Sequence, residues 1–386
     1  MNIKQLKLLA DIQTGPFGSQ LHKEDYVDIG TPIVTVEHLG NRVFTEQNLP
    51  HVSDNDKARL GKYVLKQGDI VFSRVGSVDR CSYVDAVHDG WIFSGRCLRV
   101  RPNEQLDPMY LYYYFCMEET KQFVRNIAVG ATMPSINTKL LGEVPITYPN
   151  ISEQKCIAQI LSALDDKIEN NKKINDNLQQ QAAALFANFY GQAETEVGFT
   201  EIIQILGGGT PKTGESSYWN GNVPFFTPKD LGLPYTLTTE KTITEEGLAH
   251  CNSRLYPINT VFVTARGTVG KVGLSGVPMA MNQSCYALVG KDTHQLLVYF
   301  YTLKAVDRLK HKASGAVFDA ITTRDFESEI ISKLSDNDAK AFLDIAEPIY
   351  QAILSNSIEN LRLAALRDSL LPKLMSGEID VSGIQL

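Results

Sequence analysis

The sequence lacks the marks of several protein classes. No apolar run approaches the roughly 18 residues that a membrane span needs, and the N-terminal segment shows no small-residue cleavage site of a signal peptide. The six cysteines include no CxxC pair, and the seven histidines show no metal-ligand spacing. We therefore expect a cytoplasmic chain with reduced thiols, no bound metal and no membrane contact.

Catalytic motifs are missing as well. No NPPY- or DPPY-like tetrapeptide for holding and methylating a flipped adenine is present. A GxxxxGK[ST] phosphate loop is absent, because the glycines of 267–271 have the wrong spacing. The segment 153–155 matches half of a nuclease ExK motif, but a solvated first turn of a helix explains it better. We expect a chain without catalysis or a cofactor of its own.

The charge is acidic overall but unevenly placed. The formal net charge of −7 by itself argues against a simple nucleic-acid binder. Residues 1–150 nevertheless hold 16 basic and 17 acidic side chains, and residues 194–335 hold 13 and 14, so both blocks are free to present local basic faces. Residues 336–386 hold 4 and 8. Acidity concentrated there suits a protein partner better than phosphate.

Two long stretches carry the pattern of extended helices. Residues 152–190 contain one glycine-free and proline-free run with apolar residues at three-four spacing, which predicts a helix roughly 55–60 Å long. Asn150 and Glu153 resemble a capping box at its start. A second helix is expected over 336–375, and Gly377 suits its end. The alternative is a helix buried inside one large domain.

The two seams are expected to form the helix–helix or partner interface. A polar residue within such a seam often fixes the register of a coiled coil at some cost in stability. The interface residues are Leu161, Leu164, Ile168, Asn171, Leu178 and Leu185 in the first helix, and Ile349, Ile353, Leu363, Leu366 and Leu370 in the second.

Four segments of the first half recur in the second half. The pairs are 14–19 with 207–212, 31–40 with 223–232, 68–80 with 259–271, and 129–141 with 314–326. The period is roughly 185–192 residues, so each copy is a domain plus its helix. Within each copy, 70–72 and 261–263 are expected as short strands that precede glycine turns.

The repeat predicts a mixed α/β (α+β) fold with two like domains and two long helices. We expect the helices to pack antiparallel, which relates the two halves by a pseudo-two-fold axis. The predicted segments are a recognition domain at 1–150, a helical spacer at 151–193, a second recognition domain at 194–335 and a second spacer at 336–386. Such a molecule suits a double-headed reader of a long linear ligand.

The echoing motifs resemble those of a known family, the specificity subunits of type I restriction–modification systems. The motifs are TGPFGSQL and GGGTPKTG, GDIVFSRVGSVDR and NTVFVTARGTVGK, ATMPSINTKLLGEVPITYPNISEQKCIAQILSALDDKIE, and LRDSLLPKLMSGEIDV. The resemblance covers essentially the whole chain, including the order of domain, helix, domain and helix. It implies a non-catalytic subunit in which each domain reads one half of a bipartite, asymmetric DNA site.

The resemblance also implies the partners. Double-stranded DNA is the ligand, and the helices set the spacing of the half-sites and dock two methyltransferase subunits. Two translocase–nuclease subunits can add to that complex. The cofactors, S-adenosylmethionine and ATP, are expected on the partner subunits and not on this chain.

Candidate DNA contacts lie in loops. Arg can bind guanine and Asn or Gln can bind adenine through two hydrogen bonds, whereas Lys suits phosphate. The candidates are Ser19, Gln20, Lys23, Arg74, Arg80, Thr132 and Asn137 in the first domain, and Lys212, Thr213, Lys229, Arg266 and Lys271 in the second. Solvated turn charges are the alternative for the basic residues, and a cap of the first long helix is the alternative for Thr132 and Asn137. Alternation of Arg96, Arg99 and Arg101 fits either a basic stripe or the solvent face of a sheet.

Two rival functions come from other classes. One is a scaffold whose two heads bind proteins and not DNA, which the acidic balance favours. The other is a fused methyltransferase–nuclease, which the missing catalytic motifs oppose. A salt-dependent DNA complex distinguishes the reader from the scaffold, because phosphate contacts weaken steeply with salt.

Overall fold

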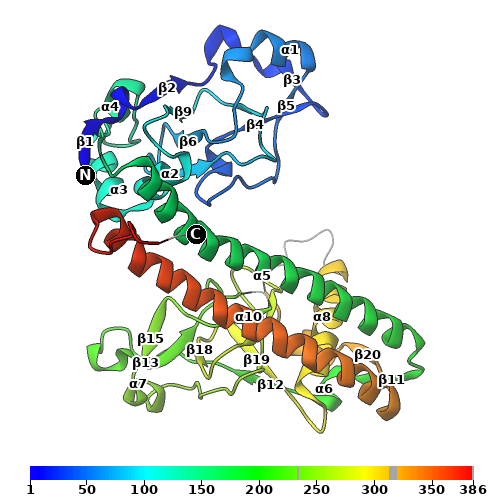
Figure 1. Ribbon diagram of the computed structural model, residues 1–386. Helices are drawn as coiled ribbons and strands as arrows, with labels where there is room; N and C mark the ends of the chain where they lie inside the picture. The colour runs from blue at the N-terminus through cyan, green and yellow to red at the C-terminus, as the bar shows by residue number, and fades with distance from the viewer. Residues whose placement is uncertain (233, 313–319, 385–386) are drawn as a thin grey trace. The chain divides into compact units, whose positions relative to one another are not determined.

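The computed structural model describes residues 1–232, 234–312 and 320–384, apart from the side chains of Ser19 and Lys23 (Figure 1). The chain forms two compact units. Unit 1 combines Met1–Lys167 with Leu363–Leu386, and unit 2 is Ile168–Arg362. Each unit therefore contains one globular domain and a part of each long helix.

The domain of unit 1 is built on two small sheets. One has the strand order β2–β9–β6–β7 with antiparallel neighbours, and the other has the order β3–β5–β4–β8, in which β4 and β8 run parallel. A separate antiparallel ribbon joins β1 and β10. The strands are β1 Asn2–Gln5, β2 Ala10–Thr14, β3 Tyr26–Val27, β4 Thr31–Val34, β5 His51–Val52, β6 Ile70–Ser73, β7 Cys81–Tyr83, β8 Ile92–Phe93, β9 Cys97–Pro102 and β10 Pro145–Tyr148. Short helices cover them: α1 Asp54–Arg59, α2 Pro108–Cys116, α3 Glu118–Ile127 and α4 Thr138–Gly142.

The domain of unit 2 repeats this plan. Its main sheet has the order β12–β19–β16–β17–β14, its second sheet the order β15–β13–β18, and its ribbon joins β11 and β20. The strands are β11 Thr195–Gly198, β12 Ile203–Gly207, β13 Trp219–Phe226, β14 Tyr235–Thr236, β15 Lys241–Ile243, β16 Val261–Thr264, β17 Val272–Ser275, β18 Ala280–Met281, β19 Cys285–Gly290 and β20 Ile330–Lys333. Its helices are α6 Phe199–Ile202, α7 Glu245–Ala249, α8 Gln295–Lys312 and α9 Thr323–Glu327.

Backbone hydrogen bonds fix how the two copies correspond. The amide of Arg74 donates to the carbonyl of Arg96 at 2.8 Å, and the amide of Ala265 donates to that of Ser284 at 2.8 Å. The predicted pairing of 68–80 with 259–271 is therefore confirmed, and Arg74 corresponds to Ala265. Residues 314–319 of the last predicted pair lie outside the described residues. The arginine of the second copy, Arg266, stands one residue later.

The two long helices are confirmed. The first, α5, spans Ile151–Gln192, and the second, α10, spans Asp336–Ser376. The Asn150 side chain accepts from the amide of Glu153 at 3.0 Å, which satisfies one of the free donors at the start of α5. Gly377 follows α10 with a φ of +78°, a left-handed conformation that commonly ends helices.

The helices run antiparallel within each unit. In unit 2 the Asn171 amide donates to Glu359 at 2.7 Å, and the Asn175 amide donates to Ser357 at 3.3 Å. The residue numbers of the α10 partners decrease as those of α5 increase, as expected for antiparallel helices. In unit 1, Arg367 of α10 pairs with Asp165 of α5 at 2.5 Å. Figure 1 shows the two helices side by side.

The predicted interface residues differ in exposure. Leu161, Asn171 and Ile353 are buried, whereas Leu366 is exposed. The remaining members are partly buried: Leu164, Ile168, Leu178, Leu185, Ile349, Leu363 and Leu370. Leu161 and Ile353 belong to the hydrophobic cores that combine domain and helix residues, and Asn171 bonds to α10. The predicted interface role of these residues stays a prediction.

The predicted roles of the β9 arginines were wrong. Arg99 is 2% exposed and pairs with Asp11, and Arg101 makes two hydrogen bonds of 2.6 Å with buried Asp69. Burial, followed by the neighbouring Arg101, lowers the pKa of Arg99. Arg99 is internal to unit 1, and the partly exposed Arg101 is paired with Asp69, so the two form neither a basic stripe nor a solvent face. Arg96, which precedes the strand, is exposed.

Candidate nucleic-acid interface

Four loops of unit 1 meet at one end of the main sheet. They are residues 15–18 after β2, 74–76 after β6, 95–96 before β9, and 129–135. Arg74 bonds to Arg96 through the backbone, Gly76 donates to the carbonyl of Pro134 at 2.8 Å, and Gly95 packs against Pro16. We call this set of loops the first loop surface.

Glycine is needed where these loops approach each other. A Cβ atom on Gly15 would lie 2.1 Å from the carbonyl oxygen of Ser94, and Gly76 has a φ of +75°. No side chain other than hydrogen fits the first position, and the second favours glycine. These glycines shape the surface and leave the contacts to their neighbours.

Arg74 and Phe17 form the centre of the first loop surface. The guanidinium of Arg74 lies 5.9 Å from the ring centroid of Phe17, within cation–π range, and donates to the Gly95 carbonyl at 3.2 Å. Phe17 is 62% exposed, and Met133 in the 129–135 loop is 64% exposed. The arginine keeps donors for a ligand while the ring restricts its position.

The corresponding surface of unit 2 has different side chains. Gly208 corresponds to Gly15, and a Cβ atom added to it would lie 2.2 Å from the carbonyl oxygen of Asn282. Thr210 stands where Phe17 stands, and its hydroxyl is hydrogen-bonded to Gln283. Arg266 is exposed and has no side-chain partner among the described residues. The position that carries the aromatic ring of Phe17 in unit 1 thus carries in unit 2 a threonine hydroxyl bonded to the Gln283 amide.

Several predicted contacts have structural partners. Gln20 is half-buried, and its side-chain oxygen accepts from the hydroxyl of Tyr63. Arg80 is exposed but donates to the carbonyl of Leu39. A Cβ atom on Gly40 would lie 2.6 Å from the Arg80 guanidinium, so this arginine braces that turn.

The alternative reading of Asn137 was correct in kind but named the wrong helix. Its side chain accepts from the amide of Leu140 at 2.9 Å and caps α4, not α5. The short α4 intervenes because Thr138–Gly142 forms one helical turn before β10. Thr132 is exposed in the loop that precedes it.

The other predicted residues are exposed in the loops of unit 2. They are Lys212, Thr213, Lys229 and Lys271. The predicted DNA contacts of Ser19 and Lys23 concern side chains outside those that the structure describes.

The sequence pattern did not predict DNA contacts at Phe17, Met133, Thr210 or Gln283. It placed Arg96 only in a strand-like segment with Arg99 and Arg101. The sequence did hold one signal for Phe17, which stands between Pro16 and Gly18. An apolar side chain is seldom needed for a turn, so its presence there indicates another role.

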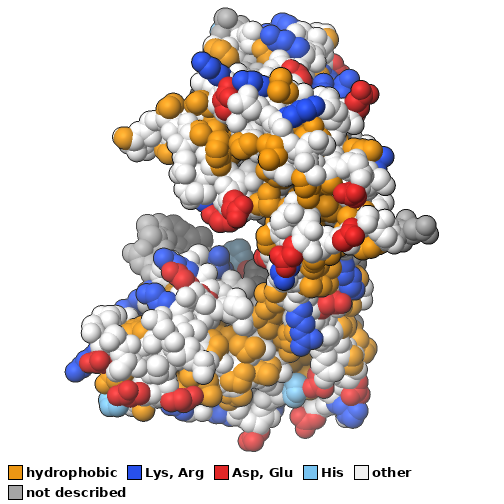
Figure 2. All heavy atoms as spheres, turned by 60° about the vertical axis from the view of Figure 1, so that its left-hand side comes forward, with side chains coloured by type: hydrophobic (Ala, Val, Ile, Leu, Met, Phe, Trp, Pro, Cys, Tyr) orange, Lys and Arg blue, Asp and Glu red, His pale blue; other side chains and the backbone are white. Residues whose placement is uncertain are grey.

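The charges on the visible face are mixed. Figure 2 shows lysine and arginine side chains interspersed with acidic ones among the described residues. Within the described ranges no His/Cys/Asp/Glu group could hold a metal ion. Searching the helices of the same ranges also finds none long and apolar enough to cross a membrane.

The comparisons with known proteins agree on one family. The family described as the type I restriction modification DNA specificity domain matches residues 1–180 and 195–360. The chain is 25% identical to the type I restriction enzyme HindI specificity subunit of Haemophilus influenzae, over 82% of this chain and 88% of that protein. It is 22% identical to the MjaIX specificity subunit of Methanocaldococcus jannaschii, over 98% and 94%.

A solved structure shares the fold. The crystal structure of the type I restriction-modification system S subunit from M. genitalium aligns with a TM-score of 0.63 at 16% identity, covering 97% of this chain and 95% of that one. Since the family match covers both domains and parts of both long helices, the chain belongs to the type I restriction–modification DNA specificity family.

Proposed function

We propose that this chain is the DNA sequence-specificity subunit of a type I restriction–modification complex. Each domain reads one half of a bipartite, asymmetric site, and the chain carries out no catalysis. The observation that carries the proposal is the pair of loop surfaces, which share a backbone frame and differ in side chains. One frame with two side-chain sets suits two half-sites of different sequence.

The chemistry of the first loop surface fits base recognition. A guanidinium donates two hydrogen bonds to guanine O6 and N7, and an apolar side chain next to it suits the thymine methyl group. The Arg74–Phe17 pair offers both. In the second surface Arg266 offers the guanine contact and Gln283 the adenine contact, with Lys271 and Lys212 at hand for phosphates.

The helices supply the partner surface in the same proposal. Two methyltransferase subunits bind the exposed residues of α5 and α10, and two translocase–nuclease subunits add to them. S-adenosylmethionine and ATP bind those partners. The acidity that favoured a protein-only scaffold lies largely in residues 336–386, where a protein partner is expected. A cytoplasmic location belongs to this proposal, because chromosomal DNA is the ligand.

A domain exchange tests the reading of half-sites. Residues 1–150 are replaced by the first domain of another family member, and the chimera is co-expressed with its partner subunits. Mapping of methylated adenines should show one half-site changed and the other retained. A change in both half-sites would contradict independent reading.

A paired insertion tests the spacing. Four residues added to each long helix lengthen them by about 6 Å, or roughly two base pairs. Methylation mapping should show a gap longer by that amount with both half-sites unchanged. An unchanged gap in a folded, active complex would refute the role of the helices in spacing.

A further inference from the structure

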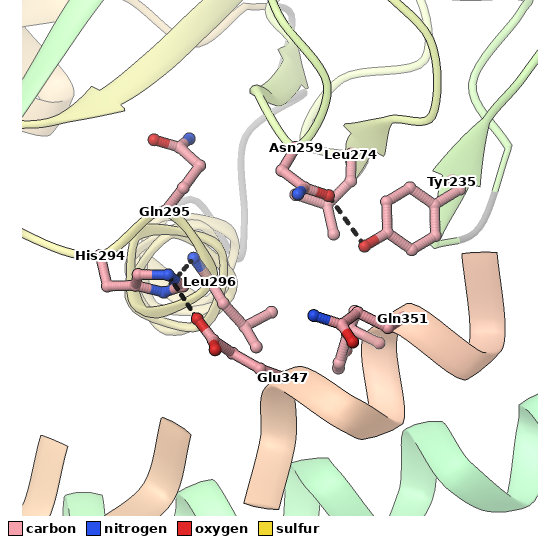
Figure 3. Close-up of a pocket in the computed structure, with 9 residues that line it drawn as sticks. Tyr235, Asn259, Leu274, His294, Gln295, Leu296, Glu347 and Gln351 are labelled. Atoms are coloured by element: carbon pink, nitrogen blue, oxygen red, sulfur yellow. Dashed lines mark hydrogen bonds and ion pairs between the residues drawn. The ribbon is translucent and has the colours of Figure 1, made fainter. Parts of the chain in front are cut away.

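Unit 2 contains a cavity for which neither the domain's fold nor base recognition has a use. It lies between the domain and α10 and has a volume of about 120 Å³. Its walls include Tyr235, Asn259, His294, Glu347 and Gln351. Figure 3 shows Glu347 and Gln351 rising from one helix and facing the domain across the space. An apolar cavity of about 150 Å³ holds a benzene molecule, so this one has room for a smaller planar group.

The matching place in unit 1 is occupied by an arginine of the chain itself. Arg42 follows β4 and reaches α5, where it donates to the Ser162 carbonyl at 3.3 Å and pairs with Asp166. The carbonyl of Arg42 accepts from the amide of Tyr83 at 2.7 Å, and that of Pro234 accepts from Leu274 at 2.7 Å. Pro234 is therefore the counterpart of Arg42, and it brings no donor to the helix.

The helix positions correspond as well. The amide of Gln154 donates to the Asn150 carbonyl at 3.0 Å, and that of Ala339 donates to the Ser335 carbonyl at 2.8 Å. Counting from these caps, Glu347 stands at the place of Ser162, and Gln351 at that of Asp166. The positions that hold the Arg42 guanidinium in unit 1 thus line the cavity in unit 2.

One oxygen of the Glu347 carboxylate, Oε1, is paired with a histidine of the domain. His294 Nδ1 accepts from the amide of Leu296 at 3.3 Å, and His294 Nε2 lies 2.6 Å from Glu347. The contact uses one carboxylate oxygen of Glu347, and the other oxygen has no hydrogen-bond partner among the described residues. The rings of Tyr235 and Tyr350 line the same cavity and lie 6.3 Å apart between centroids.

We propose that this cavity binds a guanidinium group, held by the Glu347 carboxylate and the Gln351 side-chain oxygen against the rings of Tyr235 and Tyr350. Guanidinium is the fitting cation because it is planar and because its donors match a carboxylate. The group comes either from a free alkylguanidine or from an arginine of a partner protein.

The test on the isolated full chain uses agmatine as the probe. N-carbamoylputrescine, which has the same chain with a neutral urea head, is the matched ligand. Calorimetry should show one saturable agmatine site, with binding weakened about tenfold or more by Glu347→Gln and by the urea head, as expected for a charge-assisted hydrogen bond. Glu240→Gln, an exposed charge change elsewhere in unit 2, should leave binding unchanged.

A second variant checks the correspondence of the two units. Arg42→Ala empties the counterpart in unit 1 and should raise the agmatine stoichiometry from one to two. The contrary result is a single agmatine bound by the Arg42→Ala chain with an affinity that adding Glu347→Gln does not change. That result would place the only site in unit 1 and overturn the proposal.

The two sources of the guanidinium are separated in the complex with the methyltransferase subunits. If a partner arginine fills the cavity, agmatine binding is lost in the complex and Glu347→Gln weakens assembly. If the ligand is free, agmatine binds equally with and without the partners. Absence of agmatine binding to the chain, together with assembly unaffected by Glu347→Gln, overturns the proposal while leaving the DNA-reading function intact.

Discussion

The two units attach their domains to the long helices in different ways. In unit 1 the attachment is polar: Tyr113 of α2 donates to Asp165 at 2.6 Å, and Arg367 pairs with the same carboxylate. In unit 2 the counterparts of Tyr113 and Asp165 are aromatic: Phe300 of α8 lies 5.7 Å from Tyr350 of α10 between ring centroids. The backbone plan is shared, while the chemistry of the contact is not.

This difference teaches that the duplicated frame tolerates exchange of the whole contact. An ion pair needs both partners, because one charge left without the other is costly. An aromatic cluster is stabilised by buried area and ring geometry instead. The two attachments can therefore be perturbed separately.

The largest expected effect is on the aromatic attachment. Phe300→Ala removes a ring that packs against Phe186, Phe342 and Tyr350, and should destabilise unit 2 by about 3–5 kcal/mol. Tyr113→Phe in unit 1 removes one hydroxyl and should cost about 1 kcal/mol. Hydrogen exchange by mass spectrometry localises each loss. Equal loss of protection in both units for either variant would refute separate attachment.

The next effect is on recognition and rests on the proposed function. Arg74→Ala should relax one base position of one half-site by about 1–3 kcal/mol, and Arg266→Ala should do so in the other. Binding of the assembled complex to single-base variants of the site measures the change. Lys66→Ala, an exposed change away from the loop surface, should leave the preference unchanged. Relaxation of the same half-site by both arginine variants would break the assignment.

A smaller effect is expected in the helix seam. Asn171 is 1% exposed and donates to Glu359 and Asn360, so Asn171→Ala leaves two partly buried acceptors with fewer partners and should cost about 1 kcal/mol. The neighbouring Asn170 is exposed, and Asn170→Ala should change stability by less than about 0.5 kcal/mol. Denaturant midpoints compare the two variants. Indistinguishable midpoints would mean that the polar seam is not stabilising.

The smallest effect at neutral pH concerns two equivalent thiols. Burial raises the pKa of Cys97 and of Cys285 to about 12, from an ordinary value of 9.0. Since the neutral thiol is favoured in the folded state, its contribution is complete below pH 9 and is lost as pH rises towards about 12.

Native alkylation at pH 8 measures this equivalence. Cys97 and Cys285 should react equally slowly, and the partly buried Cys251 should react first. Unequal rates for Cys97 and Cys285 would show that the two sheets open differently.

The frame of the molecule was accessible from the sequence. Long runs at three-four spacing predicted both helices because few other structures tolerate them, and Asn150 with Glu153 marked the start of α5. The echo of glycine turns located the repeat, since those turns depend on local backbone conformation.

Side-chain partners distant along the chain were not accessible. Arg99 and Arg101 alternate as on a surface strand, yet Arg99 is buried and pairs with Asp11, and Arg101 pairs with the buried Asp69. Likewise, the exposure of Phe17 depends on loops that meet only after folding, so its place beside Arg74 had no sequence signature. The predictions for individual DNA contacts stay predictions.

The single-residue displacement of Arg266 relative to Arg74 has a practical consequence for anyone redesigning such proteins. Aligning arginine with arginine would transplant a side chain onto the neighbouring backbone position, and in extended chain neighbouring side chains point in opposite directions. A graft that respects the hydrogen-bonded frame must instead match Arg74 with Ala265. New DNA specificities would then be designed by transferring whole loops rather than by substituting single residues.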